Sequence, residues 1–159
     1  MPQSPSDKPT AGNELTVAPI RGLLEALPIA VYELDRSGRI VYTNQAYASI
    51  TGYGVDELLG MYVHELMAPG PARDATPALF ERLTVEAPNP TPLTAENVPR
   101  DGRRIHVEIH WNYRRDEGGT VTGFVCALKD ITEQVRADEA LRDSEGRFRR
   151  MFEQSPWGT

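Results

Sequence analysis

The chain has 159 residues and a formal net charge of −6, with 40% hydrophobic and 25% charged residues. This length suits one ordinary domain with short ends, and the composition is that of a soluble globular protein. The acidic balance argues against a nucleic-acid partner, because binding a phosphate backbone needs a clustered basic surface. No apolar run approaches the ~18 residues of a membrane-spanning helix. The N-terminus also lacks the apolar stretch of a secretory signal, so we expect a cytoplasmic protein.

The N-terminal part of the chain predicts a flexible segment, a short helix and a β-hairpin. Residues 1–19 are rich in Pro, Ser and Gly, which favours a flexible lead-in. Three leucines at helical spacing predict a short amphipathic helix over 20–27, which Pro28 ends. The alternating runs IAVYELD and RIVYTN flank the turn residues DRSG, and they predict a hairpin over 29–44.

The middle of the chain predicts helices. The stretch 45–69 has the pattern of short helical pieces broken at glycines. Thr76 followed by Pro77 predicts an N-cap and the first residue of a longer helix, which ends near Glu86.

The C-terminal part predicts three more strands and a final helix. A weak strand over 93–98 precedes a strongly alternating strand over 104–113 and an apolar strand over 120–130. Asp130 or a nearby threonine is expected to cap the helix that follows, and Gly146 is expected to interrupt it. Five antiparallel strands with helices packed to one face predict an α+β domain.

Several motifs in this order resemble the PAS family of sensory modules in bacterial signalling proteins. They read LLEALPIAVYELDRSGRIVYTNQAYASITGY, VDELLGM, RDGRRIHVEI and GFVCALKDITE, and together they cover about Leu23 to Glu133. The resemblance implies a PAS-like five-stranded antiparallel sheet with short helices on one face, flanked by an N-terminal helix and a C-terminal exit helix. It places the PAS domain at 20–132 and a linker helix at 133–146.

The end of the chain is similar to its beginning. The tail FEQSPWGT aligns Glu153 with Glu25 and Pro156 with Pro28, so residues 147–159 resemble the truncated start of a second PAS domain. We therefore interpret the chain as the front of a longer receptor whose output domain, a histidine kinase or a diguanylate cyclase, is absent from it. No nucleophile, phosphate-loop or metal-hydrolase motif occurs, so we predict that the chain itself is not an enzyme.

The resemblance implies a cavity between the helical run and one face of the sheet, and an exit helix that carries the signal. The candidate cavity residues are Tyr42, Asn44, Phe80, Leu83, Ile109 and Trp111, and the candidate signal-transmission residues are Asp130, Ile131 and Thr132. For the aromatic residues, core packing is the alternative. For the asparagine, the alternative is a structural side-chain hydrogen bond to nearby backbone.

The cofactor stays unknown at this stage. Flavin-binding members of the family form a photoadduct through a cysteine, and that position here is Val63. Haem-binding members use a histidine on the longer helix, which has none here, although His64 keeps a haem alternative open. The single cysteine, Cys126, lies in the apolar run GFVCALK and is interpreted as a small buried side chain, which excludes an internal disulfide.

Two histidines and a glutamate raise a metal-site hypothesis. His106, Glu108 and His110 alternate along one face of the predicted strand 104–113. Because same-face neighbours on a strand stand ~6.8 Å apart, a polar solvent or interface face explains them better than a shared ion. We predict no metal site.

Partners follow from the flanking helices. Leu23, Leu24, Leu141 and Phe148 are apolar residues of the first and last helices, and they favour a homodimer through these helices. A small-molecule ligand is the second expected partner. The alternative function is a ligand-free protein–protein association module.

Overall fold

The structure, a computed structural model, describes residues 22–26 and 28–154. Five antiparallel strands form one sheet in the order β2-β1-β5-β4-β3. They are β1 (Ala30–Asp35), β2 (Ile40–Thr43), β3 (Leu93–Asn97), β4 (Ile105–Arg115) and β5 (Val121–Asp130). Strands from both halves of the chain thus join a common sheet, which confirms the predicted α+β fold.

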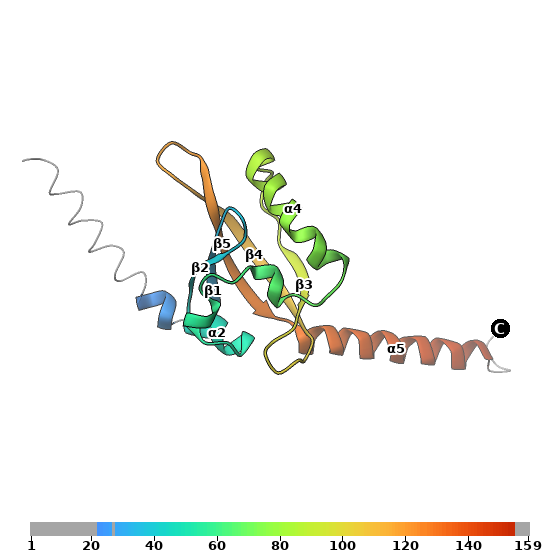
Figure 1. Cartoon of the computed structure of the whole chain (residues 1–159). Helices are drawn as coiled ribbons and strands as arrows, with labels where there is room; N and C mark the ends of the chain where they lie inside the picture. Colours follow the sequence, from blue (N-terminus) through green and yellow to red (C-terminus); the bar gives the residue numbers. More distant parts are fainter. Residues whose placement is uncertain (1–21, 27, 155–159) are drawn as a thin grey trace, which may run out of the picture.

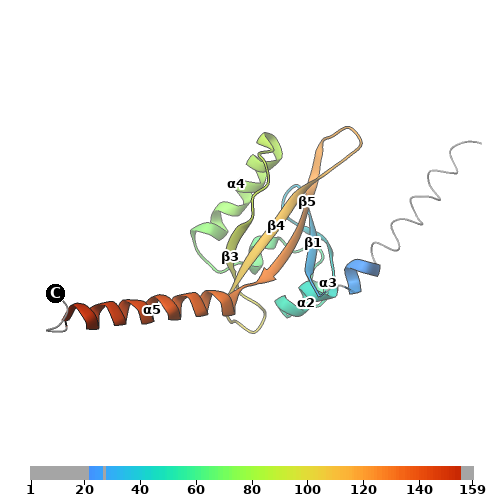
Figure 2. The same cartoon turned by 180° about the vertical axis from the view of Figure 1, so that it is seen from behind.

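Along the chain, four helices lie between β2 and β3, and one long helix follows β5. They are α2 (Gln45–Thr51), α3 (Val55–Leu58), the 3-10 helix η1 (Val63–Leu66), α4 (Pro71–Glu86) and α5 (Thr132–Gln154), and residues 22–26 form a further helical turn. In Figure 1, α2 lies near one end of the sheet, α4 runs beside β3, and α5 projects away from the domain as a rod. The view from behind shows the same separation of α5 from the other elements (Figure 2).

Strand alternation gives the sheet one apolar face and, on β4, a polar opposite face. Tyr32 and Leu34 of β1 and Phe124 of β5 are each at most 2% exposed and belong to the core. On β4, Val107 is fully buried, whereas His106 on the opposite face is partly exposed. The two predicted faces of this strand are therefore confirmed. We call the apolar face, which the helices cover, the inner face.

A glycine allows the β1–β2 turn to approach α4. Gly38 has a φ of +90°, a conformation that strains other residues, and a Cβ on it would lie 2.5 Å from Cε2 of Phe80. Asp35 stabilises the same turn, because its Oδ1 accepts hydrogen bonds from the backbone N–H groups of Ser37 (2.9 Å) and Arg39 (3.0 Å). The predicted hairpin thus forms and contacts the longer helix through Phe80.

The start of α4 differs from the sequence prediction. The helix begins at Pro71, after Gly70, and Pro77 lies inside it. Thr76 is not its N-cap, because its hydroxyl donates to the carbonyl oxygen of Ala72 at 2.8 Å. Both prolines carry the same start signal. Ala72, Arg73 and Ala75 between them are good helix formers, and the helix continues through the second proline although that residue lacks a backbone N–H donor.

The course of α5 also differs from the prediction. This helix is continuous across Gly146, where an interruption was expected. A glycine destabilises a helix by only about 1 kcal/mol relative to alanine, and strong helix formers flank it on both sides. The predicted linker 133–146 and the first residues of the predicted second unit therefore share one helix. The segments 1–19 and 155–159 lie outside the described residues, so the domain boundaries remain predictions.

Candidate functional site

A cavity of about 630 Å³ lies between α4 and the inner face of the sheet. We call it the α4 cavity. Its lining is predominantly apolar, with Tyr32, Ile109 and Phe124 on the sheet side and Leu79 and Leu83 on α4. Size and lining are those of a pocket for a small organic molecule.

Hydrogen bonds hold both ends of α4. Before the helix, the backbone N–H of Ala68 donates to the carbonyl oxygen of Glu96 on β3 at 2.8 Å. After the helix, the hydroxyl of Tyr113 donates to the carbonyl oxygen of Pro88 at 2.6 Å. Nε1 of Trp111 donates to the carbonyl oxygen of Thr91 at 2.8 Å. The middle of α4 therefore spans the cavity between two fixed ends.

An aromatic cluster connects α4 to the sheet. The ring centroids of Phe80 and Phe124 lie 5.1 Å apart, and those of Trp111 and Phe124 lie 5.9 Å apart. Phe80 and Trp111 also line the cavity. Phe80 and Trp111 therefore pack in the core and also line the cavity, although the sequence analysis treated these two roles as alternatives.

Four of the six candidate cavity residues line the α4 cavity: Phe80, Leu83, Ile109 and Trp111. Tyr42 does not line it. Tyr42 pairs with Glu33, which points away from the inner face because it lies between the inward-facing Tyr32 and Leu34, so Tyr42 also lies on the opposite face of the sheet. The pairing of β1 and β2 shifts at this point, where Val41 is the extra residue. That bulge reverses the face that simple alternation from Ile40 predicts for Tyr42.

Asn44 also lies away from the cavity, and its side chain is fully paired. The residue is fully buried, and its Oδ1 accepts from the N–H groups of Val31 (3.0 Å) and Tyr47 (3.1 Å). Its Nδ2 donates to the carbonyl oxygens of Leu24 (3.0 Å) and Ile29 (2.7 Å). Asn44 therefore caps α2 and joins the first helical turn to β1, which is the structural alternative considered for it.

Several polar cavity residues were not among the candidates, and three of them bear on the chemistry of the site. Asn97 is 6% exposed, and its Oδ1 has no hydrogen-bond partner within the described residues. Arg82 of α4 is exposed and lines the cavity, and so does Cys126 of β5. The alternation of Leu93, Ala95 and Asn97 could have identified the asparagine as a polar residue on an apolar strand face. No local pattern distinguishes Arg82 from the other arginines.

The titratable side chains on the sheet side of the α4 cavity are uncharged. Burial raises the pKa of the Cys126 thiol to about 12, so this side chain is a thiol rather than a nucleophilic thiolate at physiological pH. Burial likewise raises the pKa of the Tyr32 hydroxyl well above 10.0. Val63, at the position that the family resemblance gives to the photoadduct cysteine, also lines the cavity and has no thiol.

Hydrogen bonds tie the junction of β5 and α5 to β4. Oδ1 of Asp130 accepts from the backbone N–H of Thr132 at 2.9 Å and from its hydroxyl at 2.5 Å. Oγ1 of Thr132 in turn accepts from the backbone N–H of His106 at 3.0 Å. The N–H of Ile131 donates to the carbonyl oxygen of His106 at 2.8 Å. The first turn of α5 is therefore anchored to two neighbouring strands.

A second cavity, of about 480 Å³, lies beside this junction. We call it the junction pocket. Ile131 and Val135 of the α5 start line it, and so does His106. Met67 and Ala95 line both this pocket and the α4 cavity. The two hollows thus share a wall made by the segment after η1 and by β3.

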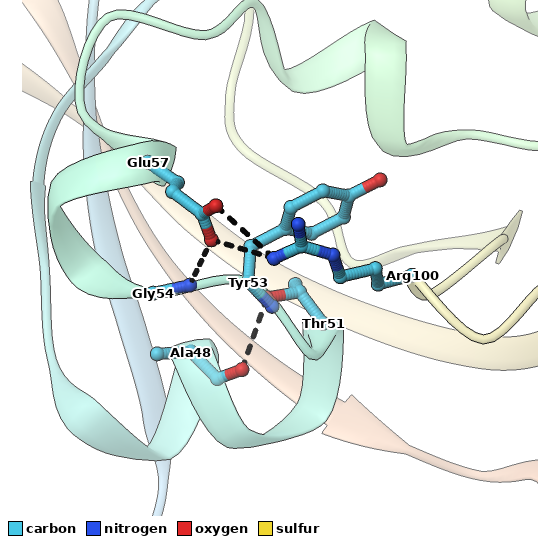
Figure 3. A network of polar contacts seen from close by, with 6 residues as sticks. All are labelled: Ala48, Thr51, Tyr53, Gly54, Glu57 and Arg100. Carbon is cyan, nitrogen blue, oxygen red and sulfur yellow. Dashed lines mark hydrogen bonds and ion pairs between the residues drawn. The ribbon is translucent and has the colours of Figure 1, made fainter.

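A polar network joins the turn between β3 and β4 to the α2–α3 region (Figure 3). The guanidinium of Arg100 donates to Oε2 of Glu57 at 2.9 Å and lies 5.3 Å from the ring centroid of Tyr53. The backbone N–H of Arg100 donates to the carbonyl oxygen of Thr51 at 2.8 Å. A hydrogen bond from the Gly54 N–H and then the Arg100 side chain lower the pKa of the Glu57 carboxyl. This network fastens the β3–β4 turn to α2 and α3.

The two histidines of β4 make separate contacts. His110 Nε2 lies 2.9 Å from Oε1 of Glu108 on the outer face, and His106 makes its contacts through its backbone at the junction. Across residues 22–26 and 28–154, no three His, Cys, Asp or Glu side chains are grouped so that they could hold a metal ion. In the same part of the chain, no helix combines the length and the apolar character needed to cross a membrane.

Curated proteins similar to this chain include sensors and kinases. Sporulation kinase C of Bacillus subtilis is 26% identical over 128 residues, which cover 80% of this chain and 29% of that protein. Virulence sensor protein BvgS of Bordetella bronchiseptica is 28% identical over 130 residues, which cover 79% of this chain and 10% of that protein. The chain thus spans less than a third of the length of these relatives.

Solved structures share the fold. The PAS domain of an HTR-like protein from Haloarcula marismortui has a TM-score of 0.64 and 23% identity, covering 79% of this chain and 99% of that one. An RNA-binding light-oxygen-voltage receptor has a TM-score of 0.72 and 24% identity, covering 92% of this chain and 41% of that one. The family model described as PAS fold matches residues 19–131, which is most of the chain. Together with the sheet order and the helix that leaves it, this match shows that the chain belongs to the PAS family.

Proposed function

We propose that this chain is the sensory module of a longer signalling protein. A small molecule in the α4 cavity changes the start of α5, and α5 passes the change to an output domain outside this chain, a histidine kinase or a diguanylate cyclase. The observation that carries the proposal is the wall that the α4 cavity shares with the junction pocket. Similarity to domains of sensor kinases supports it as well.

The relay follows contacts from one hollow to the other. An occupant of the α4 cavity contacts Ala95 of β3, whose neighbour Glu96 pairs with His106 of β4. The backbone of His106 bonds both Ile131 and Thr132. A displacement of β3 therefore reaches the first turn of α5 through these hydrogen bonds. A packed core transmits such a displacement rather than absorbing it.

Filling the shared wall tests this relay without a known ligand. We expect Ala95→Leu to alter hydrogen exchange at the amides of residues 131–135, measured by mass spectrometry on the whole chain. Ala46→Leu is the matched control, because Ala46 is a partly buried residue of α2 that lines neither hollow. Equal exchange in both variants and the wild type would contradict the relay.

A ligand-free association module is the second candidate function, and exposed apolar residues favour it. Leu141 and Met151 of α5 are 59% and 72% exposed, and Leu23 of the first helical turn is 59% exposed. Such residues are suited to pairing with a second copy of the chain through the flanking helices.

Sedimentation equilibrium and native mass spectrometry separate the two functions. We expect a dimer that Leu141→Glu weakens, whereas Glu139→Lys, on the other side of α5, leaves it unchanged. Native mass spectrometry and an absorption spectrum of freshly purified protein report whether a small molecule is retained. A dimer without any bound molecule favours the association module.

A further inference from the structure

We infer that the α4 cavity selects an elongated organic carboxylate, with an apolar body and a hydrogen-bond donor at the end opposite the carboxylate. This inference rests on the proposed ligand-binding function and deepens it. Two side chains carry it: Arg82, which would meet the carboxylate, and Asn97, which would accept the hydrogen bond.

The charge of the lining favours an anion. Among the residues that the structure describes, Arg82 is the only charged one that lines the α4 cavity. Within the described residues, none of the ion pairs involves Arg82, so its guanidinium is not paired with a carboxylate there. A guanidinium binds a carboxylate through two parallel hydrogen bonds.

The buried amide favours a donor on the ligand. Three buried side-chain atoms in the described part of the chain lack a hydrogen-bond partner: Asn97 Oδ1, Tyr47 Oη and His64 Nδ1. Of these residues, Asn97 alone lines the α4 cavity. A buried acceptor without a partner is unfavourable, and an occupant that donates a hydrogen bond removes this penalty.

The positions of the two side chains favour an elongated occupant. Asn97 forms a bridge with Met67, which lies before the start of α4. Arg82 lies about three helical turns, or ~16 Å, beyond Pro71 along α4. The lining between them is apolar, with Leu79 and Ile109 on opposite sides. Since the arginine side chain is long and flexible, a chain of about ten carbons with polar groups at both ends can reach both residues.

Isothermal titration of the whole chain with three ten-carbon probes tests the inference. The probes are 10-hydroxydecanoate, decanoate and 1,10-decanediol, each below its micelle-forming concentration. We expect 10-hydroxydecanoate to bind at least about tenfold more tightly than the diol, because a hydrogen bond to a charged group is lost in the diol. Decanoate should bind several-fold more weakly than 10-hydroxydecanoate, because it offers no donor to Asn97.

Two variants assign these preferences to their residues. Arg82→Gln should make the acid and the diol bind alike, whereas Arg73→Gln should leave the preference intact, since Arg73 lies on α4 outside the lining. Asn97→Leu should remove the advantage of 10-hydroxydecanoate over decanoate and leave the affinity for decanoate within about twofold. Thermal melting of each variant verifies that it is folded.

The outcomes distinguish the inference from the proposed function. Equal binding of acid and diol to the wild type overturns the inference, while ligand binding by the cavity stands. Preferences that survive in Arg82→Gln and Asn97→Leu also overturn it, because other residues then produce them. If none of the probes binds and the freshly purified protein carries no small molecule, both fail and the association module remains.

Discussion

Two buried asparagines behave in opposite ways on the two sides of this domain. Asn44, at the α2 side, is fully buried, and both polar atoms of its side chain are hydrogen-bonded to backbone. Asn97, at the α4 side, is 6% exposed, and its Oδ1 has no partner in the part of the chain that the structure describes. A buried polar group normally finds a partner within its own chain. The first asparagine does so, and the second leaves room for an external partner.

The packing around the two residues differs in the same way. Near Asn44, the rings of Tyr32 and Tyr47 stack with centroids 4.3 Å apart, and Tyr47 is fully buried. Near Asn97, a cavity of about 630 Å³ lies between the inner face and α4. One side of the sheet therefore supplies stability, and the other supplies a space that can be filled or emptied.

Replacing Asn44 tests the stabilising side and should have the largest effect. Asn44→Ala removes an N-cap and leaves two buried N–H donors and two carbonyl groups to find new partners. We expect it to lower the free energy of unfolding by about 3 kcal/mol, as breaking a buried network does. Urea denaturation followed by circular dichroism measures it. A loss below about 1 kcal/mol would show that water replaces these bonds and that the two sides differ less than proposed.

Replacing Asp130 tests the junction and should have an intermediate effect. Asp130→Ala removes the acceptor of the Thr132 N–H and hydroxyl, and we expect a loss of about 1 kcal/mol, the usual effect of a lost cap. Asp138→Ala, in the interior of α5, is the control in the same urea titration. In the longer parent protein, Asp130→Ala should also change basal output. Unchanged stability together with unchanged output would mean that this junction is not a point of transmission.

Replacing Asn97 tests the unpaired side and should have a small effect. Asn97→Leu removes an acceptor that bonds nothing within the described residues, and the adjoining cavity can hold the new side chain. We expect the free energy of unfolding to stay within about 0.5 kcal/mol of the wild type, or to rise. A large loss in the same urea titration would identify Asn97 as a structural residue like Asn44.

Removing only the charge of Asp35 should have the smallest effect and should depend on pH. Burial raises the pKa of Asp35, but hydrogen bonds from Ser37 and Arg39 lower it by more, so that the pKa falls below its ordinary 3.8. The charged carboxylate therefore stabilises the fold above pH 3.8, and this contribution is lost as the pH falls through the folded pKa. Asp35→Asn keeps the acceptor oxygen and should lose stability at pH 7 but not at the acid end of the titration. A difference that is independent of pH would contradict this assignment.

Local patterns in the sequence predicted most of the fold. The alternation of apolar residues indicated both hairpins, and the glycines after α2 and α3 indicated the breaks between the short helices. The sequence predicted the sheet-to-helix connection at Asp130. In the structure β5 ends at Asp130 and α5 begins at Thr132. These features depend on neighbours in the chain, on turn chemistry and on strand or helix periodicity, and a sequence displays them directly.

The tertiary structure alone decided which residues face the cavity. A single extra residue in β2 places Tyr42 on the outer face. The helix α4 begins at Pro71 rather than at Pro77, so it is longer than the sequence predicted. Asn97 and Arg82 came to line one hollow, although they belong to a strand and a helix whose separate patterns show no relation. The sequence thus determined the elements and their order, because these arise from short-range forces. Packing between elements decided the lining of the cavity, because that depends on register and on contacts between residues distant in the chain.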